Sequence, residues 1–252
     1  MKNLMDHVSA SATGGEGKRP LEDVLRDYSG IGYRMFELYM NDRGSAVNLS
    51  LGADYYKSLA RQYGIRYPSL HLFEMDPDDE ASVAKARQAA LLAKDLGIDI
   101  LVFNSTAKEN YGRALGRFLD ITEDLGQKVL LQIHEGRSLD SVDEVEAMLE
   151  TYHHHPRLKV LHEVGSYHAL GVPWKTVIDR FGKDIALVHL KDMIGAQSVP
   201  FGVGDIDLPA LITAMDAIGY QGDYVVEIAP PHREKTLQYI RDAYAYLQEI
   251  PE

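Results

Sequence analysis

Polar and charged side chains repeatedly follow apolar stretches of this 252-residue chain, at points where a buried strand would end. They include the carboxylates and imidazoles that bind divalent cations, and the chain has no cysteine that could form a thiolate site. A divalent ion in such a set would polarise the carbonyl and hydroxyl of a polyol, and a neighbouring carboxylate could remove the adjacent proton. The set comprises Glu37, His71, Asn104, Gln132, His134, Glu135, Glu163, His189, Lys191, Asp192 and Glu227.

A repeated structural unit is able to carry these residues to one place. Helix-like stretches end in a glycine followed by an apolar strand-like run, as in AKDLGIDILVFN and DRFGKDIALVHL. Glycine closes a helix at low cost because it readily adopts the left-handed conformation. The first of the predicted strands is weak, since Asp6 and His7 interrupt it. The eight predicted strands are 5–9, 33–39, 68–73, 98–104, 128–134, 158–163, 185–190 and 223–228.

Eight strand–helix units predict an α/β protein with a single (β/α)8 TIM-barrel domain over residues 1–252. The length is typical of this fold, and strands that are apolar on both faces fit a parallel sheet covered by helices. A doubly wound nucleotide-binding sheet is disfavoured because the sequence has no glycine-rich phosphate turn. In a barrel, the carboxyl ends of the strands form the active site, so the polar set would converge there.

The composition limits the partners of the chain. A net charge of −12 disfavours a protein that binds the phosphate backbone of nucleic acids. The apolar runs are about ten residues or shorter, too short to cross a bilayer, and the first 15 residues lack the apolar core of a signal peptide. We therefore expect a soluble cytoplasmic protein with no nucleic-acid or membrane partner.

Residues 188–228 form the most informative segment. They contain a His-x-Lys-Asp, a Gly-x-Gly-Asp-x-Asp loop and a Gly-Tyr-x-Gly turn before a strand that ends in Glu. This block resembles the last two strands of the sugar phosphate isomerase/epimerase superfamily of xylose isomerase-like TIM barrels, and the resemblance covers roughly residues 20 to 230. It implies a sugar or keto-sugar substrate and one divalent metal ion (Mn, Mg, Co, Zn or Fe). DNA-repair nucleases of this fold have a histidine where this chain has Ser166, so a nuclease function is disfavoured.

The resemblance also implies a set of metal ligands, namely Gln132, Glu163, His189 and Glu227. Glu163 replaces the usual aspartate and keeps its charge. Gln132 replaces the usual glutamate, and its amide can offer an oxygen to a metal but cannot accept a proton. Glu135 is the alternative ligand, although strand alternation places it on the face opposite Gln132.

Catalytic and substrate-binding roles follow from the same resemblance. Glu227 is the expected base, and a second proton-transfer group would be His134 or Glu37. Lys191 is expected to stabilise enolate charge or to hold an anionic substrate group. Substrate specificity is expected in the loops 39–50, 74–78 and 194–203. The residues expected to bind substrate are Glu37, His71, Asn104 and Lys191.

Three functions stay open at this point. The first is an isomerase or epimerase, and the second is a lyase that performs β-elimination on an inosose or 3-keto-glycoside. One base suffices for that elimination and for aldose–ketose isomerisation. The third is a non-catalytic barrel that binds a sugar or a partner.

Tyr239, Tyr244 and Tyr246 either pack the last helix against the barrel or mark a homo-oligomer face. The His153–His155 tract is interpreted as an exposed helix end.

Overall fold

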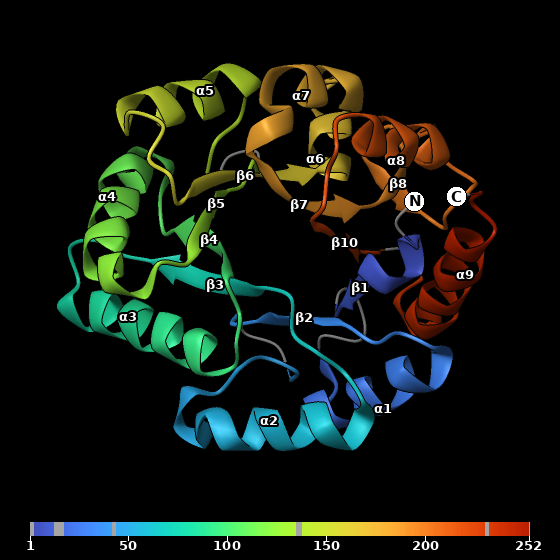
Figure 1. The fold of residues 1–252 in the computed structure, drawn as a ribbon, viewed down its shortest axis with the longest axis horizontal. Helices are drawn as coiled ribbons and strands as arrows, with labels where there is room; N and C mark the ends of the chain where they lie inside the picture. The colour runs from blue at the N-terminus through green and yellow to red at the C-terminus, as the bar shows by residue number, and fades with distance from the viewer. Residues whose placement is uncertain (1–2, 13–17, 42–43, 135–137, 230–231, 252) are drawn as a thin grey trace.

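Eight parallel strands close into a barrel in the computed structural model, which describes residues 3–12, 18–41, 44–134, 138–229 and 232–251. Figure 1 looks into the barrel, around which the strands follow one another in chain order, and β10 pairs with β1 to complete the ring. The predicted fold class is confirmed. The barrel strands are β1 (Val8–Ser11), β2 (Phe36–Tyr39), β3 (Leu70–Met75), β4 (Ile100–Ser105), β5 (Lys128–Leu131), β6 (Leu158–Glu163), β7 (Ile185–Leu190) and β10 (Asp223–Val226).

Helices surround this barrel (Figure 1), and local sequence marks their beginnings. Pro20 and Pro173 immediately precede α1 and α7, while the Asp79 and Asp207 side chains accept backbone N–H groups at the starts of α3 and α8. Gly64 ends α2 in the left-handed conformation. The helices are α1 (Leu21–Ile31), α2 (Gly52–Tyr63), α3 (Glu80–Asp95), α4 (Tyr111–Ile121), α5 (Val142–Thr151), α6 (Val164–Ala169), α7 (Trp174–Phe181), α8 (Leu208–Ala217) and α9 (Thr236–Gln248).

The strands are buried on both faces, and this produces two apolar clusters. A large cluster fills the space between the sheet and the helices. The smaller one lies inside the barrel, below the polar ends of the strands, and gives the site a rigid apolar floor. Its buried members are Val102, Leu130, Leu161, Ala186, Leu187 and Val225.

The first predicted strand, 5–9, is wrong in its position. Residues Leu4–His7 form a 3₁₀ helix, and the Asn3 side chain caps it by accepting the Met5 N–H. The strand begins only at Val8, so the polar Asp6 and His7 lie outside the sheet. His7 is instead bonded to Asp223 at the start of β10, with 3.0 Å between Nδ1 and Oδ1.

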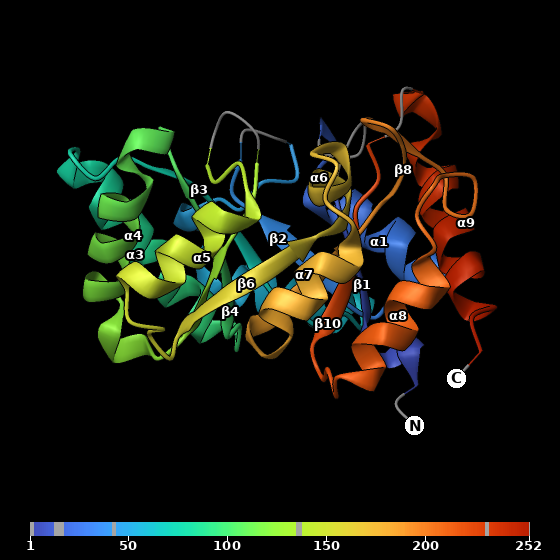
Figure 2. The same ribbon diagram turned by 90° about the horizontal axis from the view of Figure 1, so that it is seen from above.

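Two further differences concern strand length and an extra hairpin. The strand predicted at 33–39 begins at Phe36, and the one predicted at 128–134 ends at Leu131. A short antiparallel hairpin, β8 (Asp192–Ile194) with β9 (Gln197–Val199), follows β7 and was not expected. In Figure 2 it lies beside α6 at one end of the barrel.

Tyrosines of the last helix contact their own chain. The Tyr244 ring packs against Tyr33 with 4.9 Å between centroids, and its hydroxyl donates to the Gly32 carbonyl. Tyr246 packs against Phe201. These contacts fit the packing interpretation of the tyrosine-rich helix. Among the described residues, no helix is long and apolar enough to cross a membrane.

Candidate metal centre

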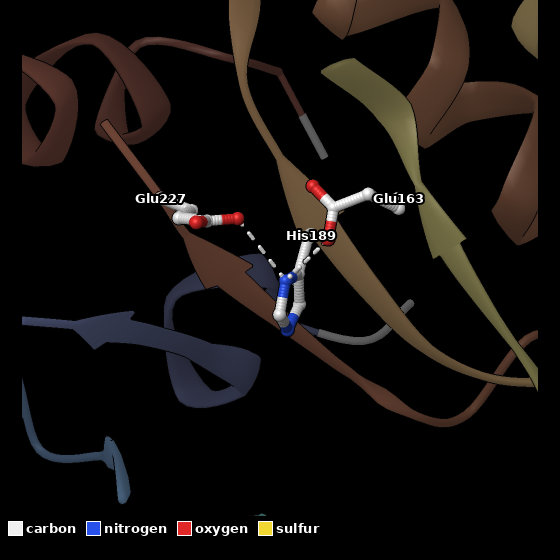
Figure 3. A group of neighbouring side chains, drawn as sticks. All are labelled: Glu163, His189 and Glu227. Carbon is white, nitrogen blue, oxygen red and sulfur yellow. Dashed lines mark hydrogen bonds and ion pairs between the residues drawn. The ribbon is translucent and has the colours of Figure 1, made fainter. Parts of the chain in front are cut away.

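Three side chains from neighbouring strands meet at the carboxyl end of the barrel (Figure 3). Glu163 ends β6, His189 lies on β7, and Glu227 directly follows β10, its N–H donating to the Leu190 carbonyl. His189 Nδ1 lies 2.9 Å from Glu163 Oε2 and 3.3 Å from Glu227 Oε2. One ligand atom from each residue lies within 4.8 Å of the other two. The two carboxylates and the imidazole therefore face a common point.

Mutual electrostatics favour the charged forms of His189 and Glu227. Burial opposes the protonated His189 ring, but the carboxylates of Glu37 and Glu163, with the Glu227 hydrogen bond, outweigh it and raise the His189 pKa well above its usual value. Burial likewise opposes ionisation of Glu227, yet Lys191 and His189 overcome this and lower the Glu227 pKa well below its usual value. Glu227 is therefore a carboxylate near neutral pH.

Lys191 is the positive charge that balances the two glutamates. Its ammonium lies 3.2 Å from Glu227 Oε2 and 3.7 Å from Glu163 Oε1, and its side chain is only 14% exposed. Burial disfavours the ammonium, but Glu227 and Glu163 more than compensate and raise the Lys191 pKa. The lysine stem lies over Gly165 of α6, where an added Cβ would come 2.6 Å from Lys191 Cδ. A glycine at this position thus lets the stem cross the helix.

Gln132 belongs to a hydrogen-bond network on the other side of the site. Its Oε1 accepts from Asn104 Nδ2 at 3.2 Å and lies 3.0 Å from His71 Nε2, while its Nε2 donates to Glu163 Oε2 at 3.4 Å. The Tyr39 ring stacks on His71, with centroids 4.2 Å apart. Gln132 thus presents its amide nitrogen to Glu163.

Glu37 lies beneath His189 and is fully buried. Its Oε2 accepts the Ser69 hydroxyl at 2.7 Å and lies 3.2 Å from His189 Nε2. In the described part of the chain, Glu37 is not among the residues that line the cavity above the site. The sequence pattern led us to expect a substrate-binding role for Glu37, whereas the structure places its carboxylate below the imidazole.

A cavity of about 130 Å³ opens above this cluster. Its lining includes the expected His71, Asn104, Gln132, His134, Glu163, Lys191 and Glu227. His134 is exposed at its edge, whereas Glu135 lies outside the described residues. Tyr39, Asn41, Glu74 and Ser166 complete the lining. Of these four, Tyr39, Asn41 and Glu74 fall in the predicted specificity loops 39–50 and 74–78, although Tyr39 and Glu74 prove to be strand residues.

An irregularity in β3 explains why Glu74 faces the cavity. The register of β3 against β4 shifts between His71 and Glu74, so these residues, three apart, both line the cavity. Phe73 is instead covered by Lys85 of α3, with its ammonium 4.2 Å from the ring centroid. Bulges of this kind re-aim side chains, and strict period-2 alternation in the sequence does not reveal them.

Asp192 organises the loop beside the cavity. Its carboxylate is fully buried and accepts the N–H groups of Met193, Gly202 and Gly204, each at 2.9 Å, and of Ile206 at 3.3 Å. A Cβ on Gly204 would come 2.1 Å from Asp192 Oδ1. The Gly-x-Gly pattern in the sequence is therefore explained by a backbone that wraps an aspartate.

The remaining histidines lie away from this centre. His153 and His154 are exposed after the end of α5, as expected, whereas His155 is half-buried and its Nδ1 accepts the Arg157 N–H at 3.3 Å. His162 precedes Glu163 on β6 and faces the ring of Tyr167 on α6. Neither ring nitrogen of His162 has a hydrogen-bond partner among the described residues, and burial lowers its pKa to about 3.

The donor set fits a single divalent cation. It consists of one imidazole nitrogen and two carboxylate oxygens at strand ends, all facing one cavity; the carboxylates suit Mg or Mn, and the imidazole suits Zn or Fe. A cation bound there would displace the proton from His189 Nδ1 and would compete with the Lys191 ammonium for the Glu163 and Glu227 carboxylates.

Comparison with known proteins gives the family. Residues 25–250 match the family model of the xylose isomerase-like TIM barrel. The chain belongs to this family. The resemblance to sugar phosphate isomerases/epimerases is thereby confirmed, and a barrel active site at the carboxyl ends of the strands is the expected arrangement.

Individual relatives of this xylose isomerase-like protein are distant. An inosose dehydratase of Geobacillus thermodenitrificans (strain NG80-2) is 28% identical over 155 residues, which are 51% of this chain and 52% of that protein. The match therefore spans about half the length of this curated relative.

Solved structures match over nearly the whole chain. They include 3-keto-D-glucoside 4-epimerase from E. coli in its apo form (TM-score 0.79, 12% identity, 96% and 98% of the two chains). A xylose isomerase-like TIM barrel protein from Mycobacterium smegmatis in complex with magnesium gives a TM-score of 0.78 at 15% identity, with 99% and 98% covered. An IOLI protein with a zinc atom gives 0.77 at 18%, with 97% of each chain covered. At such identities the likeness shows the fold alone.

Proposed function

We propose that this barrel is a divalent-metal-dependent enzyme that isomerises or epimerises a sugar or keto-sugar by removing a proton beside its carbonyl. The observation that carries the proposal is the convergence of Glu163, His189 and Glu227 below a polar cavity that also contains Lys191. The family and its epimerase and dehydratase relatives support a sugar-modifying enzyme. The structures with magnesium or zinc support metal dependence.

Glu163, His189 and Glu227 would hold the ion. Gln132, the fourth ligand that we propose, would bind through its amide oxygen. In this structure the oxygen accepts from Asn104 and the amide nitrogen faces Glu163, so the amide would turn over when the ion binds. A bound divalent ion supplies a Lewis acid that polarises the substrate carbonyl and a neighbouring hydroxyl.

Glu227 is the base in this proposal. A general base must be unprotonated when the substrate arrives, and Lys191 and His189 hold the Glu227 pKa low. Lys191 lines the same cavity, where its ammonium is placed to stabilise the negative charge that develops on an enolate oxygen. Glu227 takes the proton from the carbon next to the carbonyl and returns it to the adjacent carbon in an aldose–ketose isomerisation.

Substrate hydroxyls would be bound by His71, Asn104 and Glu74, which line the cavity on the side of β3 and β4. Epimerisation requires a second proton donor on the opposite face of the substrate. We propose His134 for this role, since it lines the cavity and is exposed at its edge.

β-Elimination is the second candidate. The inosose dehydratase relative favours it, and the site agrees with it because one carboxylate base can remove the proton while an acid such as His134 protonates the leaving hydroxyl. The products distinguish the two reactions, since elimination releases water and isomerisation does not.

Deuterium incorporation from solvent into ketoses, inososes and 3-keto-glycosides tests the proposal, with and without a chelator. We expect exchange at the carbon beside the carbonyl that stops when the metal is removed and in Glu227→Gln. Exchange that continues after complete metal removal contradicts the mechanism. Stoichiometric metal binding with no exchange on any substrate favours the non-catalytic barrel.

Loss of activity in Gln132→Ala but not in Glu135→Ala supports Gln132 as the ligand, and the reverse result transfers this role to Glu135.

A further inference from the structure

His189 is held at both ring nitrogens by carboxylates from opposite parts of the barrel. Nδ1 faces Glu163 and Glu227, which form the cluster under the cavity. Nε2 faces Glu37 of β2, at 3.2 Å from Oε2, and both side chains are fully buried. A carboxylate accepts hydrogen bonds and cannot donate them, so when a cation takes Nδ1 the remaining ring proton lies on Nε2 and is donated to Glu37.

The Glu37 carboxylate is itself fixed by its neighbours. Ser69, which directly precedes β3, donates its hydroxyl to Glu37 Oε2 at 2.7 Å. The backbones that carry Glu37 and Ser69 are also joined, since the Leu38 N–H donates to the Ser69 carbonyl at 3.1 Å. Ser11 of β1 is aligned with Glu37 in the ladder, and the Glu37 side chain crosses the barrel from β2 to reach His189 on β7. Ser69, Glu37 and His189 thus form one connected line.

We infer that Glu37 is a positioning residue that fixes the tautomer and the ring orientation of His189, so that the Nδ1 lone pair is available to a divalent cation. The inference rests on the proposed metal site and assigns to Glu37 an indirect role in place of the expected contact with substrate. Partners of this kind make a histidine ligand more basic and hold its ring in place, and their loss weakens metal binding by about 10- to 100-fold.

Zinc titration of the full-length protein against a competing chelator tests this role. Glu37→Gln removes the charge, whereas Glu37→Asp keeps the charge but shortens the side chain by one methylene so that it no longer reaches Nε2. We expect both variants to bind zinc about 10-fold more weakly or worse. Glu146→Gln, which removes a carboxylate that pairs with Arg180 on the outer helices, should stay within about 3-fold of wild type. Ser69→Ala should weaken binding less than either Glu37 variant does.

Nitrogen-15 NMR of the zinc-loaded, histidine-labelled protein gives a readout independent of activity. In wild type we expect a protonated Nε2 with a strongly downfield proton, the signature of a hydrogen bond to a carboxylate. This proton resonance should move upfield in Glu37→Asp. If Glu37→Gln does not fold, which a thermal melt reveals, Glu37→Asp and Ser69→Ala supply the same comparison.

The outcomes separate the two proposals. A wild-type protein that binds no divalent ion overturns the proposed metal site itself. A wild type that binds zinc, with a Glu37→Asp variant of equal affinity and an unchanged Nε2 proton, overturns the role of Glu37 and leaves the metal site intact.

Discussion

The amide nitrogen of Gln132 donates to the Glu163 carboxylate at 3.4 Å. A carboxylate at position 132 would face Glu163 at a similar separation and repel it. Compared with a glutamate, Gln132 therefore removes one negative charge beside Glu163, His189 and Glu227. It also leaves the cavity with one proton acceptor fewer.

Gln132→Glu should make the protein more dependent on its metal. We expect the metal-free variant to be about 1–3 kcal/mol less stable than wild type, because two carboxylates then share one buried site. Manganese should reverse this loss, and its affinity should rise at least about tenfold. Urea unfolding with EDTA or with manganese measures both effects. Equal stability of the two metal-free proteins would contradict the expected repulsion.

Divalent metal should raise the melting temperature of wild type. An ion present at 100 times its Kd stabilises the folded state by about 2.7 kcal/mol, which corresponds to about 5 °C or more for a chain of this size. His189→Ala should abolish the shift. Glu146→Gln, on the outer helix α5, is the matched control and should keep it. Differential scanning fluorimetry with zinc, manganese and magnesium also ranks the ions.

Gly165→Ala should reduce both activity and stability. The new Cβ would meet the Lys191 stem at 2.6 Å, so the ammonium must move away from Glu163 and Glu227. Alanine is a better helix former than glycine, but the two glutamates lose their buried partner, so the free energy of unfolding should fall by about 1–3 kcal/mol. We expect kcat to fall about tenfold or more.

Gly112→Ala in α4 is the control for this change, since its Cβ would only reach ordinary contact with Met148 at 3.6 Å. It should keep wild-type kcat. A Gly165→Ala variant with wild-type kcat would show that the position of Lys191 does not limit the reaction.

Glu74→Gln should raise KM about tenfold while kcat changes little. The reason is that the carboxylate is expected to bind a substrate hydroxyl equally well in the ground state and in the transition state. Steady-state kinetics on the substrate found by the exchange assay measures this. A large fall in kcat at unchanged KM would instead identify Glu74 as a proton-transfer group.

Asp192→Ala should destabilise the protein by about 3 kcal/mol, because four backbone N–H groups lose their common buried acceptor. Asp192→Asn retains one oxygen and should lose less. Urea denaturation gives the free energies of unfolding. An alanine variant as stable as wild type would mean that the loop finds other acceptors.

The sequence predicts the barrel well because its signals are local. A glycine that ends a helix, followed by a strand that is apolar on both faces, predicts the same unit wherever it occurs, and most strands lie where these signals place them. The hairpin β8–β9 was missed because its strands have only three residues each. The 3₁₀ helix at Leu4–His7 was missed because a short apolar run does not distinguish a turn of helix from a strand.

The site was predicted only in part, for a different reason. Glu163, His189 and Glu227 end successive strands, and a closed barrel brings such ends together. The position of Glu37 depends on which side chain it meets across the barrel interior, and the contact between β2 and β7 arises only from barrel closure. The direction of the Gln132 amide is likewise set by Asn104 and His71, two neighbours from other strands.

The irregularity in β3 has a consequence for how substrate range could diverge in proteins of this design. A single extra residue between His71 and Glu74 exchanges which side chains point inward from there on, without any substitution among the proposed metal ligands. In a regular strand of the same sequence, Phe73 would share the face of His71 and Glu74 would point outward, so the cavity would lose a carboxylate. Gain or loss of such an irregularity would therefore change which side chains meet the substrate while the proposed metal ligands stay the same.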